Sequence, residues 1–207
     1  DESLEAELGG LASTKFFKSV NAKMDRDYIL IIDKSGSMIS GNRWKEAQKA
    51  VEILAPRICE ADPDGVTLYL FSDMYTKHTG IKKASQISSI FAKEQPDNST
   101  NLSEVLEAAF QEHFTGRRES TILVITDGAP DSQTEVEDVI KRASNRLQRD
   151  EDLSVTFVQI GNDPGATKFL KKLDDDLECK FDIVDTVTVE EMQGMSFEAL
   201  IEKSIND

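Results

Sequence analysis

The chain has 207 residues, of which 39% are hydrophobic and 30% are charged, a composition ordinary for a globular domain with its own core. It carries 24 Lys and Arg against 39 Asp and Glu, and the formal net charge of −15 argues against nucleic acid and anionic membrane surfaces as partners, because their charge has the same sign. Cys59 and Cys179 match neither a disulfide framework nor a zinc site, and we interpret them as buried thiols of a reducing compartment.

Residues 1–24 are interpreted as an N-terminal extension, and residues 25–207 as one domain. Leu4, Leu8 and Leu11 suggest a short helix in the extension. We expect this helix to pack against the flank of the domain; a partner-binding arm is the alternative. The acidic start lacks the basic and apolar pattern of a signal peptide, although a chain without an initial Met can derive from a trimmed or longer protein.

The domain begins with a strand of apolar residues at 28–32, and an amphipathic helix follows. The apolar residues of this helix recur every three or four positions and so share one face: Trp44, Ala47, Val51, Leu54 and Ile58. A turn at 62–65, which contains Pro and Gly, then leads into a second strand at 66–71.

Helical patterns and apolar runs keep alternating to the end of the chain. Apolar runs predict further strands at 122–125 and 155–160, and a last strand is expected at 181–184. Helical stripes begin near Leu102, Val136, Ala166 and Phe197, and the last of these is the closing helix. Such alternation, with β-branched runs that suit burial on both faces, predicts an α/β fold: a single doubly wound, mostly parallel open sheet with helices on both faces.

Side chains that carry oxygen lie in three loops next to these predicted elements. Asp33, Ser35 and Ser37 come directly after the first strand, and Asp127 follows the strand at 122–125. Thr100 lies in a loop just before the helix that begins near Leu102. We expect all three segments at the carboxyl edge of the sheet, where open α/β folds bind ligands, so that the five side chains can converge.

Two carboxylates and three hydroxyls, without His or Cys, form a set of hard oxygen donors. Such a set favours one divalent cation, Mg²⁺ first with Mn²⁺ or Ca²⁺ as alternatives, over zinc or copper. Gly36 permits a tight turn that lets Ser35 and Ser37 both point inward. Because the hydroxyls are neutral, the two carboxylates at best balance the charge of the cation. The incomplete shell therefore favours an Asp or Glu from a partner protein.

The pattern Asp33-x-Ser35-x-Ser37, with Thr100 and Asp127 in these places, resembles the metal-ion-dependent adhesion site of the von Willebrand factor A family. The likeness extends over about residues 28–206. It implies that the two serines bind the metal directly and that the first aspartate often acts through water. It implies as well that the threonine and the second aspartate exchange direct for water-mediated contact, and that ligand binding is coupled to displacement of the final helix.

Simpler interpretations exist for each of these residues. Ser35 and Ser37 can close a turn, Thr100 can cap the helix near Leu102, and Asp127 can be an ordinary turn residue. Lys34 departs from the resembled pattern. Its positive charge beside the metal either weakens metal binding or points to solvent.

Other residues expected near this edge also have two interpretations. Asp73 and Asp131 are interpreted as solvated surface, with a role in supporting the metal ligands as the alternative. Met38, Met74 and Tyr75 fall on predicted loops, where they either contact a partner or fill the core.

Two N-glycosylation acceptor patterns overlap the predicted metal loop. They are Asn98-Ser99-Thr100 and Asn101-Leu102-Ser103. A glycan at either position would crowd the metal, which favours a compartment without this modification. We therefore expect a cytoplasmic location.

The sequence thus predicts a metal-dependent protein-binding module and not an enzyme. An Mg²⁺-dependent phosphohydrolase is the first alternative. Against it, no Gly-rich phosphate loop with Lys and Ser or Thr occurs, and neither His78 nor His113 is placed as a general base. A structural cation inside a larger assembly is the second alternative, and the oligomeric state stays open.

Overall fold

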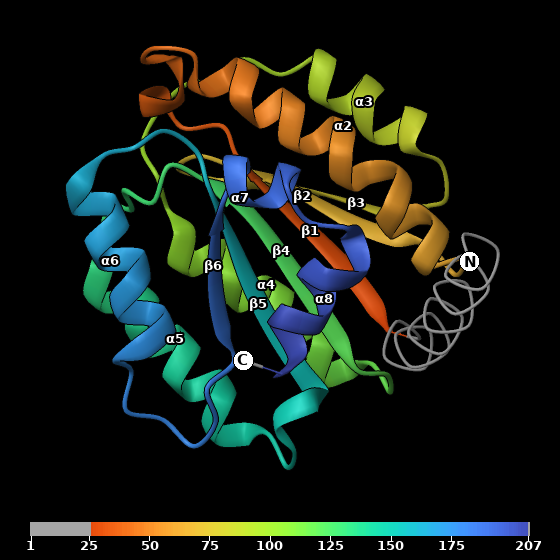
Figure 1. Ribbon diagram of the computed structural model, residues 1–207, viewed down its shortest axis with the longest axis vertical. Coiled ribbons are helices and arrows are strands. Elements are labelled where there is room, and N and C mark those ends of the chain that lie inside the picture. The colour runs from red at the N-terminus through yellow and green to blue at the C-terminus, as the bar shows by residue number, and fades with distance from the viewer. Residues whose placement is uncertain (1–25, 207) are drawn as a thin grey trace, which may run out of the picture.

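The computed structural model describes residues 26–206, so the expected extension at residues 1–24 lies outside the described residues. A six-stranded sheet in the order β3-β2-β1-β4-β5-β6 forms the centre of the domain (Figure 1). The strands are β1 (Asp27–Asp33), β2 (Val66–Phe71), β3 (Tyr75–Ile81), β4 (Ser120–Thr126), β5 (Leu153–Gln159) and β6 (Val184–Thr188). All neighbouring pairs are parallel except β2 and β3, which confirms the predicted fold class.

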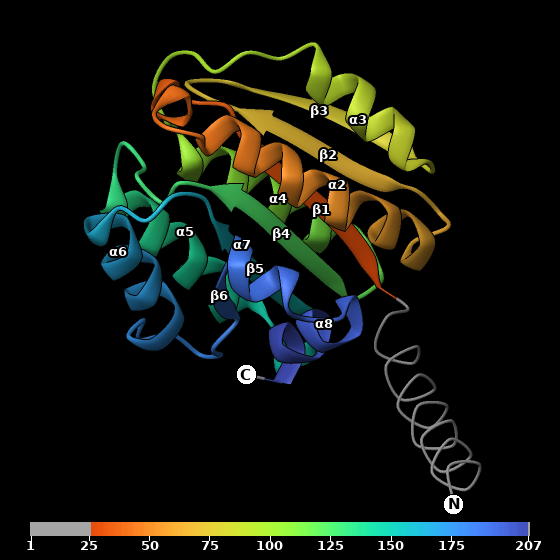
Figure 2. The ribbon, with the colours of Figure 1, turned by 45° about the horizontal axis from the view of Figure 1, so that its top comes forward.

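Helices cover both faces of this sheet (Figure 2). One face carries α2 (Arg43–Ala61), α3 (Ala84–Ala92), α7 (Val189–Gln193) and α8 (Phe197–Asn206). The other face carries α4 (Leu102–Thr115), α5 (Gln133–Arg146) and α6 (Pro164–Asp175). Two short 3-10 helices complete the described part, η1 (Gly36–Ile39) and η2 (Asp150–Asp152).

Strand β1 illustrates why the apolar runs are continuous. Leu30 and Ile32 pack in the core beneath α2, whereas Ile29 and Ile31 pack in the core beneath α4 and α5. Successive side chains of a strand point to opposite faces, and here both faces are covered by helices, so neither set can be polar. The predicted stripe of α2 is confirmed in the same way, because Ala47, Val51, Leu54 and Ile58 are each at most 1% exposed.

An edge strand and a helix were absent from the sequence prediction. Tyr75, expected on a loop, opens β3, most of whose side chains are exposed. An edge strand with two polar faces lacks the alternation that reveals a half-buried strand. Helix α3 has only nine residues and buries Ile87 and Phe91, and this short apolar stripe was overlooked in the sequence.

The last strand begins later than its predicted range, 181–184. The observed β6 starts at Val184, and Phe181 instead lies in the preceding loop, where its N–H and carbonyl both hydrogen-bond to the Ser144 hydroxyl. Polar residues in β6 interrupt its apolar pattern, so its true range could not be predicted from the sequence. Asp185, in particular, is 1% exposed and pairs with Lys203 of α8 at 2.7 Å.

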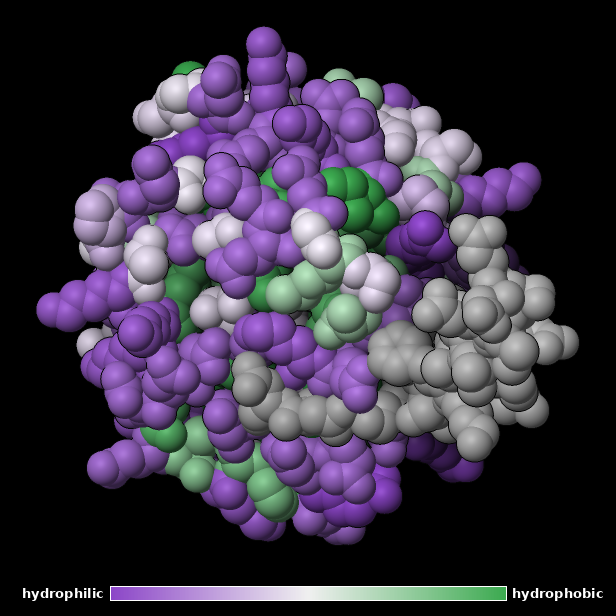
Figure 3. Space-filling model, viewed as in Figure 1, coloured by the Kyte–Doolittle hydropathy of each residue, from purple (hydrophilic) through white to green (hydrophobic). Residues whose placement is uncertain are grey.

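The surface is predominantly polar. The face that carries α2, α7 and α8 is largely hydrophilic, with smaller hydrophobic areas between the helices (Figure 3). No helix in the described part is both long and apolar enough to span a bilayer. Cys59 is buried, and Cys179 is only partly buried, contrary to the expectation of two buried thiols; neither forms a disulfide.

Candidate functional site

The loop after β1 folds back onto the carboxylate of Asp33, the last residue of that strand. The Ser35 N–H donates to Asp33 Oδ1 at 2.8 Å. The Gly36 N–H donates to the Asn98 carbonyl at 2.9 Å, and a Cβ on Gly36 would lie 3.2 Å from that same oxygen. Gly36 does not have a positive φ. Glycine therefore serves the close approach of two loops here, and not the tight turn expected from the sequence.

The loop after β4 supplies the second carboxylate. Thr126 ends β4, and its hydroxyl donates to Asp33 Oδ2 at 2.7 Å. Asp127 follows, and its Oδ1 accepts a hydrogen bond from the Ala129 N–H at 3.1 Å. Gly128 has a φ of 80°, and a Cβ there would lie 2.9 Å from Leu170 Cδ1 of α6. The turn and its packing on α6 thus hold Asp127 at the sheet edge.

Two serine hydroxyls join these loops. The Oγ atoms of Ser35 and Ser37 lie 3.2 Å apart, and Ser37 Oγ donates to Asp127 Oδ2 at 2.5 Å. Together with the bond between Thr126 and Asp33, these contacts bring the two strand ends into one network. We call these five residues the oxygen cluster: Asp33, Ser35, Ser37, Thr126 and Asp127.

Thr100 is held beside the oxygen cluster by its backbone. Its N–H donates to Asp131 Oδ1 at 2.9 Å, and its carbonyl accepts from the Asp131 N–H at 2.9 Å. The next N–H, that of Asn101, donates to the Ser72 carbonyl after β2 at 2.7 Å. Thr100 is 5% exposed, and among residues 26–206 its hydroxyl forms no hydrogen bond. The capping interpretation is wrong, because Asn101 is the N-cap of α4.

Burial gives Asp33 an unfavourable environment for its charge. Asp33 is 0% exposed and Asp127 is 1% exposed. Burial first, and the nearby charge of Asp127 second, raise the pKa of Asp33 to about 6, although hydrogen bonds from Ser35 and Thr126 favour its ionised form. Two adjacent buried carboxylates are costly unless a positive charge accompanies them.

Two basic side chains flank the oxygen cluster. Arg43, the first residue of α2, places Nη1 3.4 Å from Asp127 Oδ2 and donates to the Ser37 carbonyl at 3.2 Å. Lys34 points instead to Glu94 at 3.3 Å and Asp97 at 3.4 Å. Lys34 therefore braces the loop that leads to Thr100, and it neither reaches solvent freely nor contacts the carboxylates of the cluster.

Sequence reasoning missed Arg43 and Thr126. A signal for Thr126 was available, because parallel pairing of Ile32 with Ile125 sets the next residue of each strand, Asp33 and Thr126, side by side. No comparable signal marked Arg43, which is distant in sequence from Asp127 and meets it only because α2 begins at the same edge.

The surroundings of the oxygen cluster are partly apolar and partly hollow. Ile39 is 65% exposed and Met74 is 73% exposed, on the loops after β1 and β2. Met38, in contrast, is 0% exposed and fills the core, so a partner contact is excluded for it. A cavity of about 520 Å³ lies beside Arg43 and is lined by Arg43 and Gly161 among others, but by no residue of the oxygen cluster.

Four of the five predicted ligands thus hydrogen-bond within the oxygen cluster, and Thr100 lies beside it. The described residues contain no group of three or more His, Cys, Asp or Glu side chains that could hold a metal ion. A cation at this edge would therefore depend on hydroxyl oxygens in addition to Asp33 and Asp127, as the residue set there allows.

Known proteins match this chain through its fold. Two solved structures align with 88% of the chain: the pilus adhesin SpaC from Lactobacillus rhamnosus GG, at 14% identity and a TM-score of 0.59, and manganese-loaded Plasmodium vivax TRAP protein, at 18% identity and a TM-score of 0.56. The alignment covers 30% of the SpaC chain and 74% of the TRAP chain, so this chain spans less than a third of the adhesin. Comparison with curated proteins gives no match.

A family model describes most of the chain. The model of the von Willebrand factor type A domain matches residues 27–194, from the first residue of β1 to the residue that follows α7. That range includes all three loops that meet at the carboxyl edge of the sheet. The chain belongs to the von Willebrand factor type A domain family.

Proposed function

We propose that this domain is a protein-binding module in which a divalent cation, held at the carboxyl edge of the sheet, accepts a carboxylate oxygen from a partner protein. Asp33, Ser35, Ser37, Thr100 and Asp127 are its ligands, directly or through water. The cation is Mg²⁺ by preference, with Mn²⁺ or Ca²⁺ as alternatives. When bound, it supplies a Lewis acid to which the carboxylate of the partner can bind.

The burial of two carboxylates beside two serine hydroxyls carries this proposal. Asp33 and Asp127 are both almost completely buried, and the charge of Asp127 raises the cost of ionising Asp33. Half-buried Arg43 neutralises this pair only in part, because its guanidinium lies at 3.4 Å from one oxygen of Asp127. A divalent cation would relieve the repulsion, and hard oxygen donors are the ligands that Mg²⁺ prefers.

The same charges favour a ligand from outside the chain. A divalent cation together with the guanidinium of Arg43 carries more positive charge than Asp33 and Asp127 carry negative charge. A carboxylate from a partner would restore the balance. Ile39 and Met74, both largely exposed on loops of this edge, offer apolar contact around such a carboxylate.

Two structural relatives are consistent with this function. One is a pilus adhesin, and the other was solved with manganese. Identities of 14% and 18% show a shared fold and do not transfer a ligand or a metal to this chain.

The phosphohydrolase alternative gains no support from the positions of the histidines. His113 hydrogen-bonds to Ser120, the first residue of β4, at the opposite edge of the sheet from Asp127. His78 lies in the edge strand β3. If the wild-type chain hydrolysed a generic phosphoester and Asp33→Ala did not, the phosphohydrolase function would replace the proposed protein-binding function.

Calorimetric titration tests the metal site. We expect Mg²⁺ or Mn²⁺ to bind the wild-type chain with a stoichiometry of one, and Asp33→Ala and Ser35→Ala to lose most of this binding. Ser99→Ala is the matched control, because Ser99 is exposed in the loop next to Thr100 and should leave affinity unchanged. Equal metal affinity in wild type and Asp33→Ala would disprove the site.

Partner capture tests the function of the metal. Bound proteins should be recovered from lysate by the wild-type chain in Mg²⁺, lost in EDTA, and lost in Asp33→Ala. The acidic residues of the captured partner should then be replaced one at a time with their amides. One of these replacements should abolish the complex. If Mg²⁺ raises the melting temperature but partner capture is the same with and without Mg²⁺, the cation is structural and the proposed binding role is wrong.

A further inference from the structure

A groove runs between α4 and α5 toward the amino edge of the sheet, opposite the oxygen cluster. Its first part has a volume of about 210 Å³, with an apolar floor that includes Phe110, Phe114 and Val139 and a rim that includes Arg142 and Arg146. Phe114 and Arg146 also line an adjoining cavity of about 280 Å³, which continues beyond the end of α4. We call these two connected cavities the α4–α5 groove.

Five arginines and three acidic residues, Glu107, Glu119 and Asp152, line the α4–α5 groove, and Arg118, Arg142 and Arg149 form ion pairs. Arg117, Arg118 and Arg149 line the second cavity in addition to Arg146. The Arg146 guanidinium lies over the Phe114 ring at 3.9 Å, and among the described residues neither Arg146 nor Arg117 belongs to an ion pair. In a chain with a net charge of −15, Arg117 and Arg146 thus offer two guanidinium groups beside an apolar floor. Guanidinium groups pair well with carboxylates, so the groove suits an acidic segment that also carries apolar residues.

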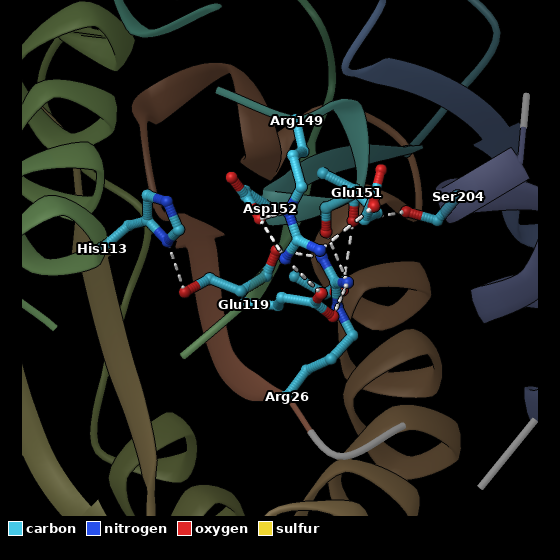
Figure 4. Close-up of polar contacts among 10 residues, drawn as sticks. Arg26, His113, Glu119, Arg149, Glu151, Asp152 and Ser204 are labelled. Atoms are coloured by element: carbon cyan, nitrogen blue, oxygen red, sulfur yellow. Dashed lines mark hydrogen bonds and ion pairs between the residues drawn. The ribbon is translucent and has the colours of Figure 1, made fainter. Parts of the chain in front are cut away.

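The described chain enters the domain beside this groove. Arg26 Nη1 pairs with Glu119 Oε2 at 3.0 Å, and Arg149 Nη2 pairs with Glu119 Oε1 at 3.2 Å (Figure 4). Glu119 itself lines the second cavity. Arg26, the first described residue, is therefore anchored at the mouth of the α4–α5 groove.

The start of the sequence has the composition that the groove requires. Residues 1–11 contain four acidic residues and no Lys or Arg: Asp1, Glu2, Glu5 and Glu7. They also contain Leu4, Leu8 and Leu11, at a spacing that can place them on one face of a helix. Residues 12–25 provide the connection, which can extend over about 45 Å at roughly 3.3 Å per residue.

We propose that residues 1–11 dock in the α4–α5 groove of their own chain, with leucines on the floor formed by Phe110, Phe114 and Val139 and acidic side chains toward Arg117 and Arg146. The tether at Arg26 raises the effective concentration of the segment and so makes the contact intramolecular. This contact is independent of the metal site, because it uses the opposite edge of the sheet and leaves the oxygen cluster open.

Amide hydrogen exchange of the 207-residue chain tests this docking. Peptides that cover residues 1–11 should exchange about tenfold or more slowly than an unstructured chain. The double variant Arg117→Glu, Arg146→Glu should lose this protection, and so should the wild type at high salt, because charges at the protein surface are screened. Arg57→Glu is the control, since Arg57 is exposed on α2, on the other face of the sheet.

A charge exchange separates direct pairing from a general loss of fold. Adding Glu5→Arg and Glu7→Arg to the double variant should restore at least half of the lost protection. Unprotected exchange of residues 1–11 in the wild type would overturn the proposal, as would full protection in the double variant. Protection that depends on protein concentration would also overturn it, because it would assign the groove to the segment of a second copy.

Discussion

At the scale of single residues, Asp33 combines complete burial with hydrogen bonds to both carboxylate oxygens. The Ser35 N–H and the Thr126 hydroxyl favour its ionised form, whereas burial and the charge of Asp127 oppose it. The opposing effects win, and the pKa of Asp33 rises from 3.8 to about 6. Without metal, the residue is therefore sensitive to pH in a range where exposed carboxylates are not.

This pKa predicts that metal-free protein gains stability from Asp33 as pH falls. Between about pH 6 and pH 4 the folded state holds a proton on Asp33 that the unfolded state has released, so acidification favours folding through this residue. The full contribution is about 3 kcal/mol at roughly 1.4 kcal/mol per pH unit. Urea unfolding in EDTA at pH 4.5 and pH 7, compared between wild type and Asp33→Asn, measures it. A pH response in Asp33→Asn as large as that of the wild type would contradict this origin.

A second prediction at this scale concerns the effect of Arg43 on Mg²⁺ affinity. Its guanidinium competes with a cation for Asp127 Oδ2, so Arg43→Gln should raise Mg²⁺ affinity by about two- to tenfold, the range of a half-buried ion pair. Calorimetry measures this change. Lys45→Gln, at an exposed position near the start of the same helix, should have no effect. Weaker Mg²⁺ binding in Arg43→Gln would mean that the guanidinium positions Asp127 and does not compete with the metal.

At the scale of elements, α8 is attached to the sheet by both apolar and polar contacts. Leu200 and Ile201 are at most 1% exposed in the core. The Ser204 hydroxyl bonds to Thr156 at 2.7 Å and to Ser154 at 3.1 Å, both on β5. Displacement of α8 would therefore have to break buried hydrogen bonds as well as expose apolar surface, and the helix is expected to keep one docked position.

Coupling between α8 and the carboxyl edge is a prediction from the family resemblance. Ile201→Ala should cost about 2–4 kcal/mol of unfolding free energy through the cavity it leaves, and it should raise affinity for the captured partner by loosening the helix. Titration of the partner measures the affinity, and urea unfolding measures the stability. Ile53→Ala, at a position 36% exposed on α2, is the matched control and should change neither quantity strongly. Unchanged or lower affinity in Ile201→Ala would count against coupling.

At the scale of the whole molecule, net charge is the dominant physical feature. A charge of −15 on 207 residues produces repulsion that the folded state concentrates and the unfolded state relieves. Arginines are placed where they offset this field locally: Arg26 is 1% exposed and reaches Glu119, and Arg118 reaches Asp64. The remaining repulsion is long-ranged and therefore sensitive to salt.

The repulsion predicts that NaCl stabilises metal-free protein. The melting temperature in EDTA should rise by a few degrees between low and physiological ionic strength, as the Debye length falls from about 30 Å to about 8 Å. Mg²⁺ at matched ionic strength should add a further, saturable increase. Asp33→Ala should keep the NaCl response and lose the Mg²⁺ increment. A melting temperature that falls with NaCl would show that ion pairs outweigh net repulsion in this fold.

Local pattern alone was enough for most of the fold and for the candidate ligands. Buried strands and amphipathic helices can be recognised from the hydrophobic pattern of short segments, as in residues 28–32 and in the stripe of α2. Asp33, Ser35, Ser37, Thr100 and Asp127 were identifiable because parallel strands bring their carboxyl ends to one edge, so position in the chain predicts position in space.

Tertiary structure decided the features that depend on pairing between distant segments. The edge strand β3 and the polar strand β6 exist because β2 and β5 offer them hydrogen-bonding partners, which no local pattern records. The proximity of Arg43 to Asp127 and the groove between α4 and α5 likewise arise only when separate elements pack. Composition and periodicity are properties of short segments, whereas the field at a carboxylate and the shape of a groove are properties of residues that meet only in the folded chain.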